Sequence, residues 1–346
     1  MFKFQGLESV GKDKISTLSE KSESINYSQL VSQGMSPNNV ITEISIRFES
    51  EYDSQKDGFP YMKTWNEVSR KWNTQVSLPN PEGLKFTAVT YGIGYKNTEY
   101  VMLIGQNDKV YIIYNAQDKH GWRWFGECNS TLVKNEQPWH SFKWIDSAVG
   151  NSNNFQTVLL GTNGLPYLVW QDHSNGLWYW GSLPAWGKTY ESFSLAKGNN
   201  GNIQASMLAT DGTPYLIWQD QSDGTWRPCN LPSNPNVKYD YIVSFKGNNG
   251  NIQAVCKDAD NTLSLIWQNQ KSGDWSYYGP LPFEQSEFQG EIAFYTSNVE
   301  DEDLSDVSWS VIVAKQVSTR TFSLYKIYLS SAGIWSWGGF YKQVNF

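Results

Sequence analysis

The nine residues "KGNNGNIQA" at 197–205 return letter for letter at 246–254, 49 residues further along the chain. Surface loops are where sequence varies most freely, so an identical loop indicates a duplicated structural unit. Aligned on this loop, the chain contains three clear copies. The tryptophan within each copy recurs after 48 and then 49 residues, as Trp170, Trp218 and Trp267. A repeat of this length is the first observation that the fold must explain.

Each copy consists of four short segments rich in β-branched and aromatic residues. In the copy at 192–230 these segments are "SFSLA", "NIQASMLA", "TPYLIWQD" and "GTWRPCN", with glycine in the turns between them. Short strands joined by glycine turns are typical of antiparallel hairpins. Four strands in a period of about 40–50 residues are typical of one blade of a β-propeller. Weaker copies at 58–79, 109–127 and 322–339 bring the total to six.

The sequence therefore predicts an all-β fold, a six-bladed β-propeller of four-stranded antiparallel blades. Seven blades is the alternative, because 346 residues hold about seven periods. Residues 28–346 are expected to form a single propeller domain of six repeats, each of about 49 residues. Residues 1–27 form an N-terminal extension, either a mobile arm or the source of a closing strand. Longer spacings indicate loop insertions near 128–140 and 298–306; the acidic run "VEDEDLSD" in the second lacks the glycine and terminal glutamate of an EF-hand loop.

Composition argues against several classes of function. The formal net charge is −7 with five arginines, so the basic stripe that nucleic-acid binding needs is missing. There is no apolar run long enough for insertion into a membrane. The first residues, "MFKFQGLESVGKD", lack the apolar core of a secretory signal. We therefore expect synthesis in the cytosol without a signal peptide, followed by action there or, after release, outside the cell. Three cysteines without a CxxC pair and three scattered histidines predict free thiols, no metal site and no cofactor.

A ligand site is predicted where two kinds of turn meet. Because strands alternate in direction, the loop between strands one and two of a blade lies at the same end as the turn between strands three and four. This places the amide-rich "KGNNG" beside the turn in "WQDQSDGTW". Amide and carboxylate groups suit sugar hydroxyls, which both donate and accept hydrogen bonds, and indole rings stack on the apolar face of a sugar. The predicted ligand-binding residues are Trp178, Trp226, Trp275, Asp172, Asp220, Asn199, Asn200, Asn248, Asn249, Gln171 and Gln219.

Each of these residues also has a purely structural interpretation. Asp172 and Asp220 stand directly before a turn, where a carboxylate accepts backbone N–H groups as an Asx-turn. The Asn-Gly loops can serve left-handed turn geometry alone. The inner tryptophans, such as Trp218, are expected in the core between blades. The outer tryptophans either cap the next blade or line an exposed platform.

The repeated units "PYLVWQD…GLWYWGSLP" and "PYLIWQD…GTW" resemble those of bacterial and fungal β-propeller lectins. The resemblance implies sugar pockets between tandem blades, for fucose-like, galactose-like or O-methylated sugars, with no catalysis. It also implies that Trp178, Trp226 and Trp275 are the stacking rings. The three weaker copies lack the "WQD" triplet, so binding is expected around the three clear copies.

The sequence thus predicts a multivalent lectin whose partners are glycans or glycoproteins, and it leaves the oligomeric state open. The alternative is a protein-binding propeller scaffold, for example the targeting subunit of a toxin or adhesin complex. A glycosidase is less favoured, because it needs one unique acid and one unique nucleophile or base. Here the polar residues recur from blade to blade instead.

Overall fold

The computed structural model describes residues 31–36, 41–47, 58–66, 71–128, 141–150, 154–172, 174–198, 201, 203–220, 222–246, 252–260, 262–269, 272–281, 292–295, 307–318, 321–330 and 335–345. The extension at 1–27 and the insertions at 129–140 and 298–306 lie outside these residues. The chain divides into two compact units, one of Phe4–Leu183 and one of Pro184–Phe346 with Met1–Lys3.

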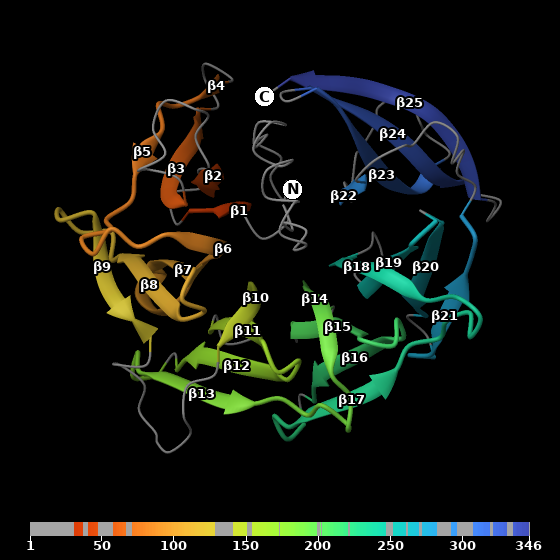
Figure 1. Cartoon of the computed structure of the whole chain (residues 1–346), viewed down its shortest axis with the longest axis horizontal. Coiled ribbons are helices and arrows are strands. Elements are labelled where there is room, and N and C mark those ends of the chain that lie inside the picture. Colours follow the sequence, from red (N-terminus) through yellow and green to blue (C-terminus); the bar gives the residue numbers. More distant parts are fainter. Residues whose placement is uncertain are drawn as a thin grey trace. The chain divides into compact units, whose positions relative to one another are not determined.

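The unit Phe4–Leu183 contains three antiparallel sheets (Figure 1). The first consists of β1 (Val31–Met35), β2 (Ile41–Arg47), β3 (Phe59–Asn66), β4 (Lys71–Trp72) and β5 (Val76–Ser77). The second consists of β6 (Phe86–Ile93), β7 (Glu99–Gly105), β8 (Val110–Asn115) and β9 (Trp122–Glu127), with the 3-10 turn η2 (Tyr95–Asn97) between β6 and β7. The third consists of β10 (Phe142–Val149), β11 (Phe155–Gly161), β12 (Pro166–Gln171) and β13 (Trp178–Ser182).

The unit Pro184–Phe346 also contains three antiparallel sheets, each of four strands. The first consists of β14 (Tyr190–Lys197), β15 (Ile203–Ala209), β16 (Pro214–Gln219) and β17 (Trp226–Asn230). The second consists of β18 (Tyr239–Lys246), β19 (Ile252–Asp258), β20 (Leu263–Gln268) and β21 (Trp275–Tyr278). The third consists of β22 (Ile292–Tyr295), β23 (Val307–Ser318), β24 (Thr321–Ser330) and β25 (Trp335–Asn345).

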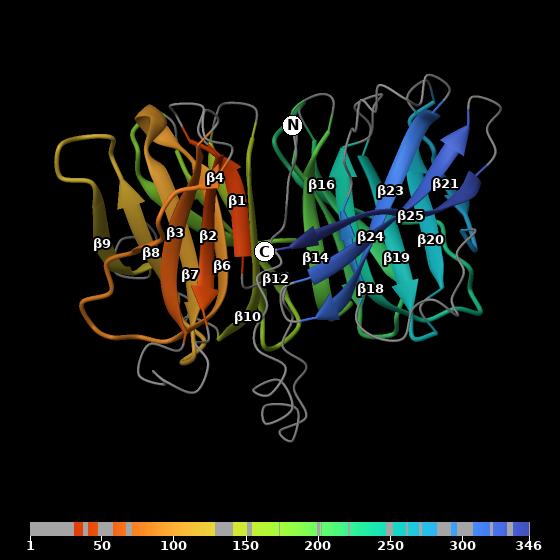
Figure 2. The same ribbon diagram turned by 90° about the horizontal axis from the view of Figure 1, so that it is seen from above.

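The strands of each sheet run alternately up and down in chain order, so successive loops emerge at opposite ends (Figure 2). In β14–β17, Lys197 pairs with Ile203 and Gln219 with Trp226 at one end of the sheet. We call this the hairpin end, because it carries the loop between the first two strands and the hairpin between the last two. The linker end carries the turn between the second and third strands and the connection to the next sheet.

The hydrophobic core lies between the faces of consecutive sheets. One cluster joins β6–β9 to β10–β13 and includes the fully buried Met102 and Leu159. A second joins β1–β5 to β6–β9, and a third joins β14–β17 to β18–β21. A sheet covered on both faces needs no alternation of polar and apolar residues along its strands. This explains continuous apolar runs such as "YVMLI" in β7, which contributes Met102 to the first cluster and Leu103 to the second.

Hydroxyl groups connect the first strands of neighbouring sheets. The hydroxyls of Thr90 on β6 and Ser147 on β10 lie 2.6 Å apart. In the other unit, the backbone N–H of Ser244 on β18 donates to the hydroxyl of Ser194 on β14 at 3.0 Å. These contacts are buried, so each satisfies polar groups that water cannot reach.

A backbone hydrogen bond connects neighbouring sheets at the linker end as well. The residue that begins the first strand of one sheet donates its N–H to the turn between strands two and three of the preceding sheet. The donor–acceptor pairs are Phe86–Gly58 at 2.8 Å, Phe142–Asp108 at 2.8 Å and Tyr239–Gly212 at 3.1 Å. At these three junctions, the turn of one sheet therefore sets the position at which the next sheet begins.

The predicted fold class is confirmed, because the described residues form all-β antiparallel sheets in the up-and-down order of propeller blades. There are six sheets among these residues. The first differs from the expected four strands, because its fourth strand is interrupted and both β4 and β5 pair with β3. The four strands predicted in 192–230 match β14 to β17. No described helix has the length and apolar character needed to cross a membrane.

The three cysteines are free, as predicted. Cys128 and Cys256 are buried, and Cys229 is half-buried. Burial raises the pKa of the Cys128 thiol to about 12 and that of Cys256 further still. Both buried thiols are therefore protonated at neutral pH and behave as small apolar core residues.

Candidate functional site

The hairpins that carry the predicted site share one backbone geometry. In β14–β17, Asp220 donates its N–H to the carbonyl of Thr225 at 2.8 Å and accepts from the N–H of Gly224 at 2.8 Å. Gly224 has φ +72°, a left-handed conformation that glycine adopts without steric cost. Gly176 and Gly273 occupy the same place in their hairpins, with φ of +73° and +76°. The glycine of each copy is thus required by the turn.

The predicted aspartates hold these hairpins together. The Oδ1 atom of Asp220 accepts the backbone N–H of Ser222 at 2.9 Å and its hydroxyl at 2.7 Å. Asp172 makes the same two contacts with Ser174, at 2.7 and 2.6 Å. These are Asx-turns, so the structural interpretation of both residues is realised. A role of these carboxylates in sugar binding stays a prediction.

The predicted glutamines hold the hairpins as well. Gln171 is 3% exposed, and its Oε1 accepts the backbone N–H of Tyr95 in the preceding sheet at 3.0 Å. Its Nε2 donates to the Tyr100 hydroxyl at 2.7 Å and to the Gly176 carbonyl at 3.1 Å. The Nε2 of Gln219 donates to the Gly224 carbonyl at 3.1 Å. Gln171 therefore fastens its hairpin to the neighbouring sheet, in addition to closing the turn.

The three outer tryptophans differ in exposure. Trp178 is 5% exposed and stands edge-on to Tyr100 at 5.1 Å and to Phe155 at 6.0 Å between ring centres. The prediction of an exposed stacking ring at Trp178 therefore has to be corrected, because these two rings cover it as part of the core. Trp226 and Trp275 are half-buried, and a stacking role for them stays a prediction.

The inner tryptophans were expected in the core, and they are half-buried at its edge. Trp218 packs against the buried cluster between β14–β17 and β18–β21. Trp170 stacks on Tyr179 of the outermost strand, with ring centres 5.7 Å apart and an angle of 22° between the planes. In β14–β17 the equivalent tryptophan, Trp218, pairs with Arg227 on the outermost strand, where β10–β13 has Tyr179. The outermost strand of a sheet has no further strand beside it, so the rings opposite it remain partly accessible.

The four predicted asparagines, Asn199, Asn200, Asn248 and Asn249, lie outside the described residues. The strand ends beside their loops are described. Lys197 pairs with Ile203, and residue 246 pairs with residue 252, both at the hairpin end of their sheets. The register thus agrees with the predicted location of the two loops, and contacts of the asparagines with a ligand stay a prediction.

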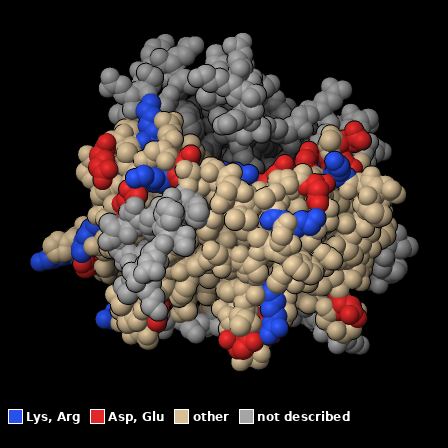
Figure 3. Space-filling model, turned by 60° about the horizontal axis from the view of Figure 1, so that its bottom comes forward, with Lys and Arg blue, Asp and Glu red and all other residues tan. Residues whose placement is uncertain are grey.

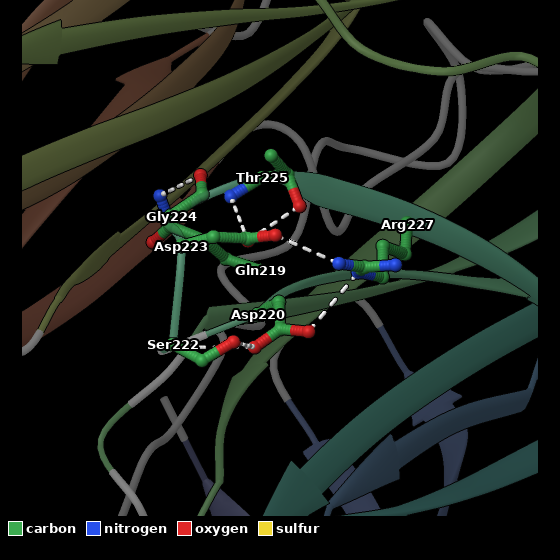
Figure 4. A network of polar contacts seen from close by, with 7 residues as sticks. All are labelled: Gln219, Asp220, Ser222, Asp223, Gly224, Thr225 and Arg227. Atoms are coloured by element: carbon green, nitrogen blue, oxygen red, sulfur yellow. Dashed lines mark hydrogen bonds and ion pairs between the residues drawn. The ribbon is translucent and has the colours of Figure 1, made fainter.

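An arginine that sequence reasoning missed is central to the hairpin of β14–β17. Arg227 is half exposed, and its Nε lies 3.0 Å from Oδ2 of Asp220. Its terminal nitrogen lies 2.7 Å from Oδ2 of Asp223. Figure 4 shows dashed lines from Arg227 to both carboxylates, with Ser222 beside Asp220 and Thr225 beside Asp223. Arg227 therefore bridges the two carboxylates of an exposed turn.

The sheet β6–β9 repeats this arrangement in simpler form. Arg123 follows Trp122 just as Arg227 follows Trp226. Arg123 pairs with Asp118 of its own hairpin, and its guanidinium lies 5.7 Å from the ring centre of Tyr114. The signal for both arginines was in the sequence, as Trp-Arg at the start of the fourth strand, but only the fold shows that each reaches back to a turn carboxylate.

Hydrogen bonds lower the pKa values of these carboxylates, which are ionised at neutral pH. The Ser222 hydroxyl and N–H lower the pKa of Asp220 below its ordinary value, and those of Thr225 do the same for Asp223. The pKa of Asp118 is lowered chiefly by its hydrogen bond from Arg123. With two carboxylates and one guanidinium, the hairpin of β14–β17 carries one net negative charge.

The surface around the described residues is mixed in charge. Figure 3 shows lysines and arginines interspersed with aspartates and glutamates on a face that is mostly neither. Among the residues that the structure describes, no group of three or more histidines, cysteines and acidic residues could hold a metal ion. What the hairpins offer is donors, acceptors and partly exposed rings, which is the chemistry of binding a hydroxyl-rich ligand.

No protein-family model matches this chain, and no curated protein matches it in sequence. Solved structures do resemble it. The BP39L lectin from Burkholderia pseudomallei has a TM-score of 0.60 at 14% identity, covering 90% of this chain and 83% of that one. A mutant of the Aleuria aurantia lectin AAL, in complex with Fucα1-6GlcNAc, has a TM-score of 0.52 at 13% identity, covering 91% and 96%.

A polysaccharide lyase of family PL25, an ulvan lyase bound to a GlcA(1-4)Rha3S unit, has a TM-score of 0.56 at 8% identity. The alignment covers 90% of this chain and 83% of the lyase. At such identities the likeness establishes a shared fold. Because the same fold serves both lectins and a lyase, the function has to be argued from the residues of this chain.

Proposed function

We propose that this protein binds glycans without transforming them, through the hairpin ends of several of its sheets. The partners are glycans or glycoproteins that carry exposed sugar units. The proposal keeps the half-buried Trp226 and Trp275 as stacking rings. It adds Arg227 and Arg123 as hydrogen-bond donors and takes Trp178 out of the ligand-contacting set.

The observation that carries the proposal is the exposed network of Arg227 with Asp220 and Asp223. Its ion-pair distances of 3.0 and 2.7 Å hold donor and acceptor groups in fixed positions next to the outer strand. A sugar hydroxyl both donates and accepts, so a fixed guanidinium beside a fixed carboxylate suits it. The pair Arg123–Asp118, with the ring of Tyr114, supports the proposal because it supplies the same groups in another sheet.

The ionisation of the aspartates favours binding over catalysis. Glycoside hydrolysis needs one carboxyl group that is protonated at working pH and one that is ionised. The pKa values of Asp220 and Asp223 are both lowered, so neither is suited to act as the acid. Repetition of the arrangement in β6–β9 also fits several equivalent binding sites better than one reaction centre.

The charge of the hairpin favours neutral sugars. One net negative charge in β14–β17, on a chain with a formal net charge of −7, repels uronic and sialic acids. Fucose-like, galactose-like and O-methylated sugars are neutral and present both hydroxyls and an apolar face. Several sites on one chain would increase the apparent affinity for a glycan-coated surface by about 10²- to 10⁴-fold.

The test is a glycan array followed by calorimetry on the wild-type protein, Arg227→Ala and Arg123→Ala. We expect binding to neutral glycans, with a lower stoichiometry in each variant and an unchanged affinity at the remaining sites. Asp260→Asn, in the exposed turn between β19 and β20 at the linker end, is the matched control and should keep the full number of hairpin sites. No binding to any neutral glycan, or equal binding by all variants, would refute the proposal.

The same samples distinguish the alternatives. Release of reducing ends or of unsaturated uronates from polysaccharides would establish an enzyme. Capture of a protein partner that persists in excess free monosaccharide would instead favour the scaffold or targeting role. We further propose that the protein is released and binds its glycans outside the cell. The test is immunoblotting of the medium of intact cultures, in which the protein should be found.

A further inference from the structure

The connection from Leu183 to β14 contains an exposed tryptophan in an unusual backbone conformation. Trp186 is 57% exposed, the largest value among the large apolar side chains that the structure describes as exposed. Its φ is +52° and that of Gly187 is +72°. The N–H of Lys188 donates to the carbonyl of Ala185 at 2.9 Å, which closes a tight turn around these two residues.

This backbone is unfavourable for tryptophan. Positive φ at both central residues is characteristic of a type I′ turn, in which asparagine, aspartate or glycine occupies the first central position. A bulky side chain in the left-handed region brings Cβ close to the backbone and raises the free energy of the fold. The ring at 186 offsets little of that cost by burial, since most of its surface is exposed.

Two other connections that the structure describes do without such a residue. The linker before β6 turns at Asn80, where the N–H of Gly83 donates to the carbonyl of Asn80 at 3.1 Å. The linker before β18 turns at Asn234, whose carbonyl accepts from Val237 at 3.1 Å. Both have Asn-Pro at the start of the turn. Trp186 therefore departs from these two described connections, and the turn itself does not require it.

Polar groups lie beside this turn on the same end of the sheet. The N–H of Thr210 donates to the carbonyl of Thr189 at 3.0 Å, which aligns the linker with the turn between β15 and β16. The hydroxyls of these two threonines are also 3.0 Å apart, and both residues are exposed. Lys188 and Asp211 form an ion pair at 2.9 Å. The charges cancel, and the Lys188 ammonium also lies 5.5 Å from the ring centre of the buried Tyr215. The residues that follow Trp186 and the turn aligned with them therefore carry hydroxyl, ammonium and carboxylate groups.

We propose that Trp186 is the stacking platform of a second saccharide site, at the linker end of β14–β17, with Asp211, Lys188 and the two threonine hydroxyls as its polar contacts. An exposed ring surrounded by polar groups fits a sugar, which has one apolar face and a rim of hydroxyls. A docking surface for a protein or a membrane would add apolar neighbours. Ala185, Gly187 and Lys188 supply none of appreciable size.

The site stands apart from the hairpins discussed above. It lies at the opposite end of β14–β17 from Arg227. Gln219 is the last residue of β16 and Trp226 the first of β17, at the hairpin end, whereas Leu208 pairs with Pro214 at the linker end. It also rests on separate observations, which are the exposure of Trp186, its left-handed backbone conformation and its difference from the two other described connections. Loss of either site therefore leaves the other intact.

The experiment is ¹⁹F NMR of the full chain labelled with 5-fluorotryptophan. The signal of residue 186 is identified as the one missing in Trp186→Asn. The probes are methyl α-L-fucoside, methyl β-D-galactoside and methyl α-D-glucoside at millimolar concentrations. We expect a saturable shift of this signal with at least one of them. The shift should need about tenfold more sugar in Asp211→Asn, since a hydrogen bond to a charged group is lost, and should be unchanged in Arg227→Ala.

Trp186→Asn separates a ligand site from a packing role. Asparagine suits the left-handed turn, so the variant should fold with a Tm equal to the wild type or about 2 °C higher, while saccharide binding at this site is lost. A lower Tm would show that the ring stabilises the fold, and it would overturn the proposal. The proposal would also be overturned if the ¹⁹F signal of residue 186 did not shift with any of the three glycosides. A shift of this signal with protein concentration or with phosphatidylcholine vesicles instead would overturn it too.

Discussion

Replacing Gln171 with leucine should uncouple a hairpin from the neighbouring sheet. The side chain is 3% exposed, and its amide makes hydrogen bonds to the Tyr95 N–H, the Tyr100 hydroxyl and the Gly176 carbonyl. Leucine nearly preserves the volume of glutamine but can neither donate nor accept. The change therefore removes three hydrogen bonds without opening a large cavity.

The expected cost follows from the fate of each partner. A typical hydrogen bond contributes about 1 kcal/mol net, and more when its partner is left buried and unsatisfied. The Tyr100 hydroxyl retains a hydrogen bond with Thr98, so the loss of its hydrogen bond with Gln171 is partly offset. We expect Gln171→Leu to lower the free energy of unfolding by about 2–3 kcal/mol.

The assay compares Gln171→Leu with Gln219→Leu by urea unfolding and by hydrogen exchange. Gln219 occupies the same position of its own hairpin but is only half-buried, and its bond to the Gly224 carbonyl is exposed to solvent. We expect this control to cost about 1 kcal/mol or less. Exchange should accelerate at the Tyr95 amide only in Gln171→Leu. Equal costs for the two variants, or unchanged exchange at Tyr95, would refute the reasoning.

Three further predictions concern other parts of the fold. Gly212→Ala should destabilise the protein by about 1–3 kcal/mol more than Gly224→Ala. Both glycines have positive φ, but an added Cβ at Gly212 would lie 2.9 Å from the Cβ of Lys238, whereas no atom lies within 4 Å of an added Cβ at Gly224. Equal midpoints of thermal unfolding for the two variants would contradict this. The pKa of Asp223 is lowered by the Thr225 hydroxyl and N–H, so its contribution to stability is present above the ordinary value of 3.8 and is lost as the pH falls through the lowered pKa. A ¹³C NMR titration of this carboxyl should give a midpoint below that value. The half-buried Cys229 should react faster with a disulfide reagent than the buried Cys128 and Cys256 in the folded protein, although burial raises the pKa of its thiol as well. Equal reaction rates for the three thiols would contradict the structure.

The repeat made most of the secondary structure predictable. A fixed spacing of tryptophans and a glycine in each turn locate four strands per copy, and the strands β14 to β17 lie where those signals place them. The glycine signal succeeds because its cause is local. A left-handed residue at Gly224 is required by the hairpin itself, whatever packs around it.

The site was less predictable, because contacts between sheets decide which repeated residues are accessible. Trp178 and Trp226 occupy the same position of the repeat, yet the first is buried under Tyr100 and Phe155 and the second is half-buried. Nothing in the spacing of the letters specifies which rings of a preceding sheet will cover a given indole. Arg227 was missed for a related reason, since its partners are visible only once the hairpin is folded back on itself.

The joint between Gln171 and Tyr95 has its two halves in successive copies of the repeat. Duplication of one whole repeat would copy both the glutamine of the hairpin and the segment that its counterpart in the next copy contacts. A newly added copy would therefore already contain the residues that join it to its neighbours. The half in the preceding copy is a backbone N–H, which every residue except proline supplies. The joint therefore tolerates substitution at position 95 but depends on glutamine at 171, and a hybrid chain that keeps this glutamine should keep the joint.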